Sequence, residues 1–196
     1  NPSISTEEMV AQVTMAGLEV ESVEPAASSM SGVVVGEIIS IEQHPGADKL
    51  RVCQVLGGEA QAQVVCGAPN ARVGIKVPFA VVGAKLPSDF KIKKAKLRGA
   101  ESFGMLCSQA ELQLGDDDSG LWELPTDAPV GVDLIEYLDL NDNIIEVDLT
   151  PNRGDCLSIR GLAREVGVLN QEAVTQEACA PVAATIDDKV SVTLEA

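Results

Sequence analysis

The spacing of hydrophobic residues predicts a helix near the start of the chain. The apolar residues that recur at helical spacing are Met9, Val10, Val13 and Ala16. Ser5 can cap the helix, and Glu8 stands three residues later, which is the capping-box spacing. Gly17 is expected to end the helix. Apolar and acidic residues then alternate over 18–23, which predicts a strand.

Between residues 32 and 98 the pattern changes to short β-branched runs separated by Gly and Pro. The expected strands are 32–42, 50–56, 61–66, 76–82 and 91–98. Turns are expected at His44–Asp48 and at Gly67–Asn70, where Pro fixes φ and Gly allows a sharp bend. Short strands with turns of this kind are typical of a small barrel or sandwich. Five strands with a basic rim fit an OB-fold.

Shorter elements follow, and helical spacing returns near the end. The expected elements are a short helix within 103–114, a strand at 121–124, a helical turn at 133–138, a strand at 145–149 and a helix at 159–169. Trp122, the lone tryptophan, is expected to anchor a core. Asp155 is expected to cap the last helix.

This order of elements predicts a mixed α+β fold with two domains. The simplest arrangement places the helix and strand from each chain end in one small α+β domain, residues 1–32 and 149–196. A five-stranded OB-fold β-barrel, residues 33–148, is then inserted between its halves. The chain begins without Met and ends in what reads as a strand. We therefore expect it to be a piece of a longer protein.

Composition agrees with a folded, β-rich chain. Of its 196 residues, 45% are hydrophobic and only 3% are aromatic, so the cores must consist mainly of Val, Ile, Leu and Ala. The cysteines are Cys53, Cys66, Cys107, Cys156 and Cys179. Their odd number and the lack of a Cys-x-x-Cys pair predict reduced thiols in a cytoplasmic protein. No apolar run of about 18 residues predicts a membrane span, and no secretory signal is present.

The charge distribution singles out one segment. The net charge is −16, which should repel nucleic acid at long range. Residues 85–98 nevertheless hold six of the fourteen basic residues, and residues 99–148 hold thirteen acids and no base. The basic residues of the first segment are Lys85, Lys91, Lys93, Lys94, Lys96 and Arg98. Such a cluster indicates either a phosphate-binding face or an edge strand that lysines protect against pairing.

Residues beside the cluster favour a binding face. Gly99 and Gly104 are expected where the backbone turns sharply or approaches another group closely. Ser102 can offer its hydroxyl to a phosphate or a base. Met105 is either a stacking surface or core filler. Lys49 follows the first turn and can reach the same rim, or it is simply a solvated loop lysine.

Other chemistries lack the residues they need. His44 is the only histidine and lies beside Pro45 with no nucleophile elbow, which argues against a Ser–His or Cys–His site. Zinc ligand sets and phosphate-binding glycine loops are missing. Asp116–Asp118 lacks the calcium-loop pattern and is expected to be a solvated face. We expect no catalytic residue and no metal ligand.

Three motifs in order resemble a known module. They are His44–Leu50, Val65–Ala68 and Lys96–Gly99 with Ser102–Met105. Together they resemble the tRNA-binding OB module found in several synthetases and in free-standing tRNA-binding proteins. Met15–Val20 before the module and Thr150–Cys156 after it resemble the N-terminal part of bacterial phenylalanyl-tRNA synthetase β subunits. The resemblance covers essentially the whole chain.

The resemblance implies a non-catalytic, tRNA-binding segment of a ligase that works in protein biosynthesis. The full enzyme would be an α2β2 heterotetramer that uses ATP and magnesium, with aminoacylation in the α subunit and the magnesium site later in β. No cofactor is then expected in this segment. RNA contact is implied for Lys49, Arg98 and Ser102, and the basic face adds Lys91, Lys93, Lys94 and Lys96.

Two other functions remain open at this point. The barrel and the helical domain can be a scaffold that packs against the rest of the synthetase without touching tRNA. Alternatively, the chain is a free-standing tRNA-binding dimer, although its long C-terminal flank argues against this. The sequence does not assign roles to Asn152, Arg153 and Asp155, for which a helix-entry and inter-domain role is expected.

Overall fold

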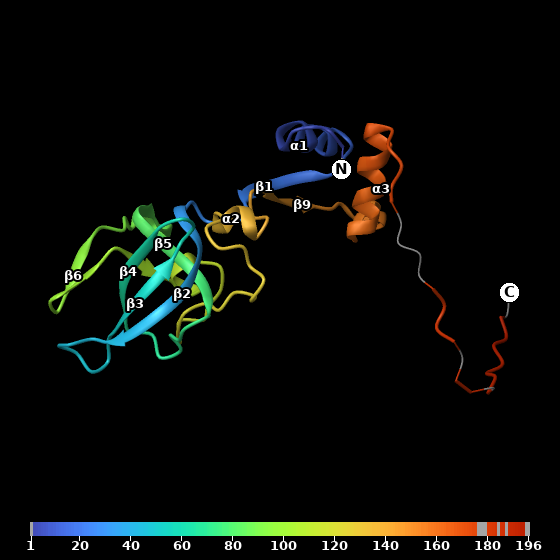
Figure 1. Cartoon of the computed structure of the whole chain (residues 1–196). Coiled ribbons are helices and arrows are strands. Elements are labelled where there is room, and N and C mark those ends of the chain that lie inside the picture. The colour runs from blue at the N-terminus through green and yellow to red at the C-terminus, as the bar shows by residue number, and fades with distance from the viewer. Residues whose placement is uncertain (1, 176–179, 184, 187, 195–196) are drawn as a thin grey trace. The chain divides into compact units, whose positions relative to one another are not determined.

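The computed structural model describes residues 2–175, 180–183, 185–186 and 188–194 (Figure 1). The chain forms two compact units, which divide after residue 20 and after residue 146. The first unit holds both chain ends and the second holds the residues between them. The expected terminal strand is absent from 188–194, and its last two residues, like Cys179, lie outside the described part. Among the described helices, none has the length and apolarity to cross a membrane.

The first unit is built on two helices. The predicted capping box starts α1 (Thr6–Met15): the Glu8 amide donates to Ser5 Oγ at 3.2 Å, and the Ser5 amide donates to Glu8 Oε2 at 2.8 Å. The second helix, α3 (Ile159–Asn170), matches the prediction within a residue. A small core joins them, with Val13, Leu18 and Cys156 buried. β1 (Glu19–Pro25) and β9 (Asn143–Asp148) form a two-stranded sheet.

The entry to α3 differs from the prediction. A 3₁₀ segment, η3 (Pro151–Cys156), comes first, and Ser158 rather than Asp155 caps the helix by accepting from the Gly161 amide at 3.1 Å. Asp155 was the wrong cap because its carboxylate binds Arg153, with Nε to Oδ1 at 3.3 Å. Arg153 also donates to the Ala16 carbonyl at 2.9 Å. These residues therefore tie the end of α1 to the start of α3.

The second unit is organised around a five-stranded antiparallel sheet. Its strands are β2 (Ser31–Gln43), β3 (Arg51–Leu56), β4 (Gln61–Cys66), β5 (Lys76–Lys85) and β8 (Gly104–Leu106). The order across the sheet is β4-β3-β2-β5-β8. The sheet curls into a half-barrel (Figure 1), and β2 changes register between Ile38 and Ser40 where it bends. The first four strands lie where the sequence predicted them.

Both faces of this sheet are apolar. The inner core contains Ile38, Val55, Val77 and Phe79, whereas Val33 and Val35 point into a second core on the other face. The second core also contains Leu134 of the short helix α2 (Leu134–Tyr137), a helical turn that the sequence predicted. Trp122 is half-buried and packs against this second core, so it lines the core rather than filling its centre.

The predicted fifth strand at 91–98 is wrong. Only 95–97 of that range form a strand, β6 (Ala95–Leu97), which pairs with β7 (Ala100–Ser102) in a separate hairpin. The physical reason is that Ile92 alone of this run is buried in the core, whereas Ala95, Leu97 and the lysines are exposed. The fifth strand of the sheet is β8, which lies in the segment predicted to be helical. In that segment only the 3₁₀ turn η2 (Ala110–Leu112) is helix-like; a second 3₁₀ turn, η1 (Pro87–Asp89), precedes the hairpin.

The predicted strand at 121–124 is also wrong. The side-chain amide of Asn70 donates to the Leu121 carbonyl at 2.9 Å and accepts from its amide at 2.9 Å. The Asn70 side chain thereby binds the two main-chain groups of Leu121 that a neighbouring strand would otherwise bind. Leu124 alone makes a β-bridge, to Lys76 of β5. A side chain from a distant turn therefore holds this segment in an irregular conformation.

Candidate nucleic-acid interface

The β6–β7 hairpin carries Lys96 and Arg98 away from the sheet, and Lys91, Lys93 and Lys94 lie in the segment that leads into it. Its two-residue turn consists of Arg98 and Gly99, both with positive φ, 44° and 101°. This is the pattern of the tight hairpin turns whose twist matches the flanking strands, and it explains why Gly follows Arg. Arg98 is exposed at the tip of the hairpin.

The cations of this region differ in how they are paired. Lys91, Lys93, Lys96 and Arg98 are exposed, and in the described part of the chain no carboxylate lies within 4.0 Å of their charged atoms. Lys94 is different. Its ammonium lies 2.9 Å from Glu101 Oε1 and 4.6 Å from the centre of the Phe103 ring. Lys94 is therefore held on the hairpin, whereas the other four side chains can bind an anion without first breaking an ion pair.

His44 links this hairpin to the loop that carries Lys49. The ring is 3% exposed, and its Nδ1 accepts from the Gly46 amide at 3.0 Å. The other nitrogen, Nε2, then carries the proton and donates to the Leu97 carbonyl at 3.0 Å. Sequence reasoning considered His44 only as a catalytic residue and missed this role. The sequence did contain a signal for this role, because the lone histidine is the first residue of the His44–Leu50 motif, which also contains Lys49.

Two further contacts fix the hairpin against β4. Gln63 donates from Nε2 to the Glu101 carbonyl at 2.8 Å, and its own carbonyl accepts from the Phe103 amide at 2.8 Å. Lys49 is exposed, like the hairpin lysines. Because the hairpin is anchored on both sides, its cations are presented in a defined arrangement rather than on a loose loop.

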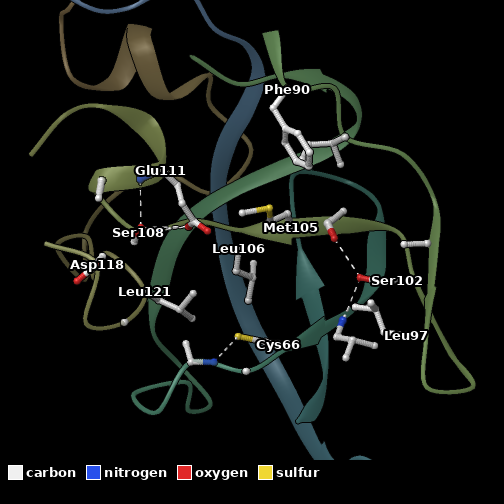
Figure 2. Close-up of a pocket in the computed structure, with 18 of the residues that line it drawn as sticks. Cys66, Phe90, Leu97, Ser102, Met105, Leu106, Ser108, Glu111, Asp118 and Leu121 are labelled. Carbon is white, nitrogen blue, oxygen red and sulfur yellow. Dashed lines mark hydrogen bonds between the residues drawn. The ribbon is translucent and has the colours of Figure 1, made fainter. Parts of the chain in front are cut away.

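Ser102 has a structural position. It is 3% exposed, and its hydroxyl accepts from the Val65 amide at 3.0 Å and donates to the Gly104 carbonyl at 3.0 Å (Figure 2). It therefore joins the edge of β4 to the start of β8. Its hydroxyl already uses its proton within the protein, so a contact between Ser102 and RNA remains a prediction.

Gly104 is required by a close approach, as expected for a glycine in this motif. Its φ is 145°, and a Cβ at this position would lie 2.4 Å from Cε2 of Phe79 and 2.7 Å from the Ala80 carbonyl oxygen. Met105 is half-buried and packs against the core of the outer sheet face. The glycine therefore allows β8 to lie directly on β5 beside a buried aromatic ring.

A cleft of about 830 Å³ adjoins the hairpin (Figure 2). Its walls come from the end of β4, the turn after it, β8, the hairpin and the segment 108–121. Labelled side chains in Figure 2 include Cys66, Phe90, Met105, Leu106 and Leu121. Sequence reasoning did not predict this cleft, because its walls are brought together from segments that lie between Val65 and Leu121 in the sequence.

One thiol in the cleft has a perturbed pKa. The Cys53 thiol donates a hydrogen bond to the Cys66 sulfur, and the Ala68 amide donates to it as well, at 3.4 Å. These bonds stabilise the thiolate and lower the pKa of Cys66 to about 7. Burial has the opposite effect on Cys107, whose pKa is raised to about 12. Cys66 is therefore the more readily ionised of these thiols.

The described residues contain one group of possible metal ligands, Asp155, Cys156 and Glu165, whose ligand atoms lie within 4.8 Å of one another. The guanidinium of Arg153 already occupies this group: it lies 2.9 Å from Glu165 Oε2 and 3.1 Å from the Cys156 sulfur. Its hydrogen bond to Asp155 lowers the pKa of that carboxyl. A thiol is also a poor ligand for magnesium, which prefers oxygen. The group therefore does not fit a magnesium site.

Comparison with known proteins gives a consistent result. A family model described as a putative tRNA-binding domain matches residues 33–133. The "Phenylalanine--tRNA ligase beta subunit" of Pseudomonas fluorescens is 64% identical over 169 residues, which are 86% of this chain and 21% of the relative. The protein of that name from Pseudoalteromonas translucida is 60% identical over 195 residues, which are 99% of this chain and 24% of the relative. The chain thus spans less than a quarter of the length of these two relatives.

Among solved structures, the MetRS related protein from Pyrococcus horikoshii matches with a TM-score of 0.39 and 25% identity, over 51% of this chain and 85% of that chain. The family model matches residues 33–133, which are more than half of the 196 residues. That range also includes the hairpin, the His44 loop and the cleft. The chain belongs to the tRNA-binding domain family.

Proposed function

We propose that this chain is a tRNA-binding segment of a phenylalanine--tRNA ligase β subunit and has no catalytic residue of its own. The high identity to β subunits along nearly the whole chain supports this. The full enzyme would join phenylalanine to its tRNA in the cytoplasm, using ATP and magnesium, as an α2β2 assembly. Those cofactors and the α subunit belong to the proposal for the full enzyme.

We infer that the binding face consists of the exposed cations of the hairpin and of the His44 loop. The members free of ion pairs in the described structure are Lys49, Lys91, Lys93, Lys96 and Arg98. The observation that carries the proposal is that these cations lie on the hairpin, on the segment leading into it and on the His44 loop bonded to it, in a chain whose net charge is −16. Lysine and arginine side chains of this kind bind phosphates without reading sequence.

The remaining residues of the predicted site take supporting roles in this proposal. Lys94 binds RNA only if it releases Glu101, so its contribution is smaller than that of its neighbours. Ser102 holds the hairpin on β4 through its two hydrogen bonds. His44 holds the hairpin against the Lys49 loop. The proposed face is therefore a rigid arrangement of charges.

We also propose that residues 33–148 form an OB-fold domain inserted between 1–32 and 149–196. Support comes from the strand order β4-β3-β2-β5-β8 in a curled antiparallel sheet and from the compact unit within residues 21–146. OB-folds are five-stranded, partly open barrels that commonly bind oligonucleotides. Expression of residues 21–146 alone tests the domain proposal, which requires a cooperative unfolding transition in that segment.

A matched pair of charge reversals tests the binding face. Lys96→Glu changes a hairpin cation, and Arg164→Glu makes the same change on an exposed residue of α3. The measurement is the affinity of the 196-residue chain for tRNA by fluorescence anisotropy at fixed salt. Lys96→Glu should weaken binding at least several-fold, while Arg164→Glu should have little effect. Equal effects of the two variants, or no effect of either, would refute the assignment.

A further inference from the structure

The cleft beside the hairpin lies between the two ends of the curled sheet. β4 and β8 are the first and last strands in the order across the sheet, and both contribute walls. Ser102 bridges these edges at one point, through Val65 and Gly104. Beyond that bridge the edges separate, and the cleft fills the space between them.

Main-chain groups on one edge face this space. The Cys107 amide donates to the Pro78 carbonyl at 3.0 Å, so residue 107 faces β5. In an antiparallel pair, adjacent residues direct their main-chain groups to opposite sides. The amide and carbonyl of Leu106 are therefore directed away from β5 and towards the cleft. Together they offer one donor and one acceptor at the strand spacing.

The side chains around these groups are mainly apolar. Figure 2 shows Phe90 on one side of the cleft and Cys66 on the other, with Met105 and Leu106 between them. Phe90 is 59% exposed, so its ring is available for stacking. Leu121 closes another wall. These walls suit a flat, uncharged ring rather than an ion.

The charges around the cleft favour a base inside it and a phosphate outside it. Glu111 and Asp118 lie on the same wall, and the Glu111 carboxylate accepts from the Ser108 amide at 2.7 Å. Two carboxylates would repel a phosphate from the interior, while they can accept from the amino groups of a base. Lys93 stands at the hairpin side, where a phosphate would lie once the base is inside.

We propose that this cleft binds one unpaired nucleobase of a single-stranded RNA segment, through contacts of the base with Phe90, Leu121 and the main chain of Leu106. The proposal rests on the proposed function, because the hairpin cations would hold the flanking phosphates. It adds a base-binding site to a face that otherwise recognises only the backbone. A volume of about 830 Å³ is ample for one base and its sugar.

The test compares two short RNAs and four proteins, the wild type and three variants. The probes are a labelled single-stranded RNA tetranucleotide and the same molecule with one abasic residue. Ala110→Trp places a ring into the cleft from its half-buried wall, and Val73→Trp adds the same ring at an exposed loop position as the control. Lys96→Glu reports the backbone contacts separately.

Removal of the base should weaken binding to the wild-type chain and to Val73→Trp about tenfold. Ala110→Trp should bind both RNAs alike, at the level of the abasic probe. Nuclear Overhauser contacts from base protons to the methyl groups of Met105 and Leu121 should appear in the wild type. This second readout needs no variant, so it decides the matter if Ala110→Trp does not fold.

The possible failures are distinguishable. Equal wild-type affinity for both RNAs, with binding still weakened by Lys96→Glu, overturns the base site and leaves the phosphate-binding face intact. Contacts from the base to methyl groups outside the cleft, such as those of exposed Val82, instead of Met105 and Leu121 also overturn the base site. Absence of binding to either RNA overturns the base site, while the proposed function fails only if the chain also does not bind tRNA.

Discussion

Neutralising single hairpin lysines should change the salt dependence of tRNA binding in steps that the ion pairing predicts. Each phosphate contact contributes about 0.7 to 0.9 to the slope of log affinity against log salt concentration. If the five cations that lack ion pairs all contact phosphates, the wild-type slope is about −3.5 to −4.5. Raising salt from about 50 to 200 mM should then weaken binding on the order of 100- to 500-fold.

Lys96→Gln removes one of these contacts. The slope should become shallower by about 0.7 to 0.9, and the same salt change should weaken binding only about 50- to 150-fold. The matched control is the double variant Lys94→Gln/Glu101→Gln, which removes both members of the 2.9 Å ion pair and leaves the net charge unchanged. Its slope should equal that of the wild type.

Fluorescence anisotropy titrations of labelled tRNA at five or more salt concentrations give the slopes. The reasoning is refuted if Lys96→Gln and the double variant change the slope equally. It is also refuted if the wild-type slope is below about 1, because several phosphate contacts cannot give so weak a dependence.

Four further predictions concern stability, the hairpin turn, the hydrogen bond from His44 to Leu97 and the Cys66 thiol. Gly161→Ala should lower the free energy of unfolding, measured in urea, by about 1–3 kcal/mol, because the added Cβ would lie 1.9 Å from the Asp155 carbonyl oxygen. Gly154→Ala is the control, because its Cβ meets nothing within 4 Å, and it should leave the free energy of unfolding nearly unchanged. Arg98→Asn should keep the melting temperature, since Asn tolerates positive φ, yet weaken tRNA binding. His44→Ala should speed hydrogen exchange at 95–97 and weaken tRNA binding, while Lys49→Gln weakens binding without that change. Alkylation of Cys66 by iodoacetamide should reach half its maximal rate near pH 7, because thiolate forms as pH rises through the lowered pKa; a half-maximal rate near pH 9 would contradict this.

Local patterns predicted the regular elements well. The capping box at Ser5 and Glu8 and the strand at 61–66 have the expected bounds. In these segments the signal is contained in the segment itself: a side chain that caps its own helix, or a β-branched run between turns. Neighbouring residues are sufficient to specify such elements.

Features that depend on distant side chains could not be read in this way. Asn70 holds Leu121 in an irregular segment, and His44 holds Leu97 across 53 positions of sequence. The motif pointed to Ser102, but its hydroxyl turned out to be buried between two strand edges. Predicting these contacts requires knowing which segments meet.

The basic segment has one feature that the sequence predicted and others that it did not. Its charge pattern identified the exposed cations, because charge is a property of the residues themselves. The pattern suggested a sheet strand at 91–98, whereas an independent hairpin formed at 95–102. The ion pair between Lys94 and Glu101 was not predicted either. It distinguishes Lys94 from the lysines that can bind an anion without first breaking an ion pair.

Lysine acylation of the 196-residue chain with and without tRNA, read by mass spectrometry, tests the central claim most directly. The account predicts that tRNA protects Lys91, Lys93 and Lys96 several-fold while exposed Lys189 reacts at an unchanged rate. Equal reactivity of the hairpin lysines in the bound and free chains would contradict it.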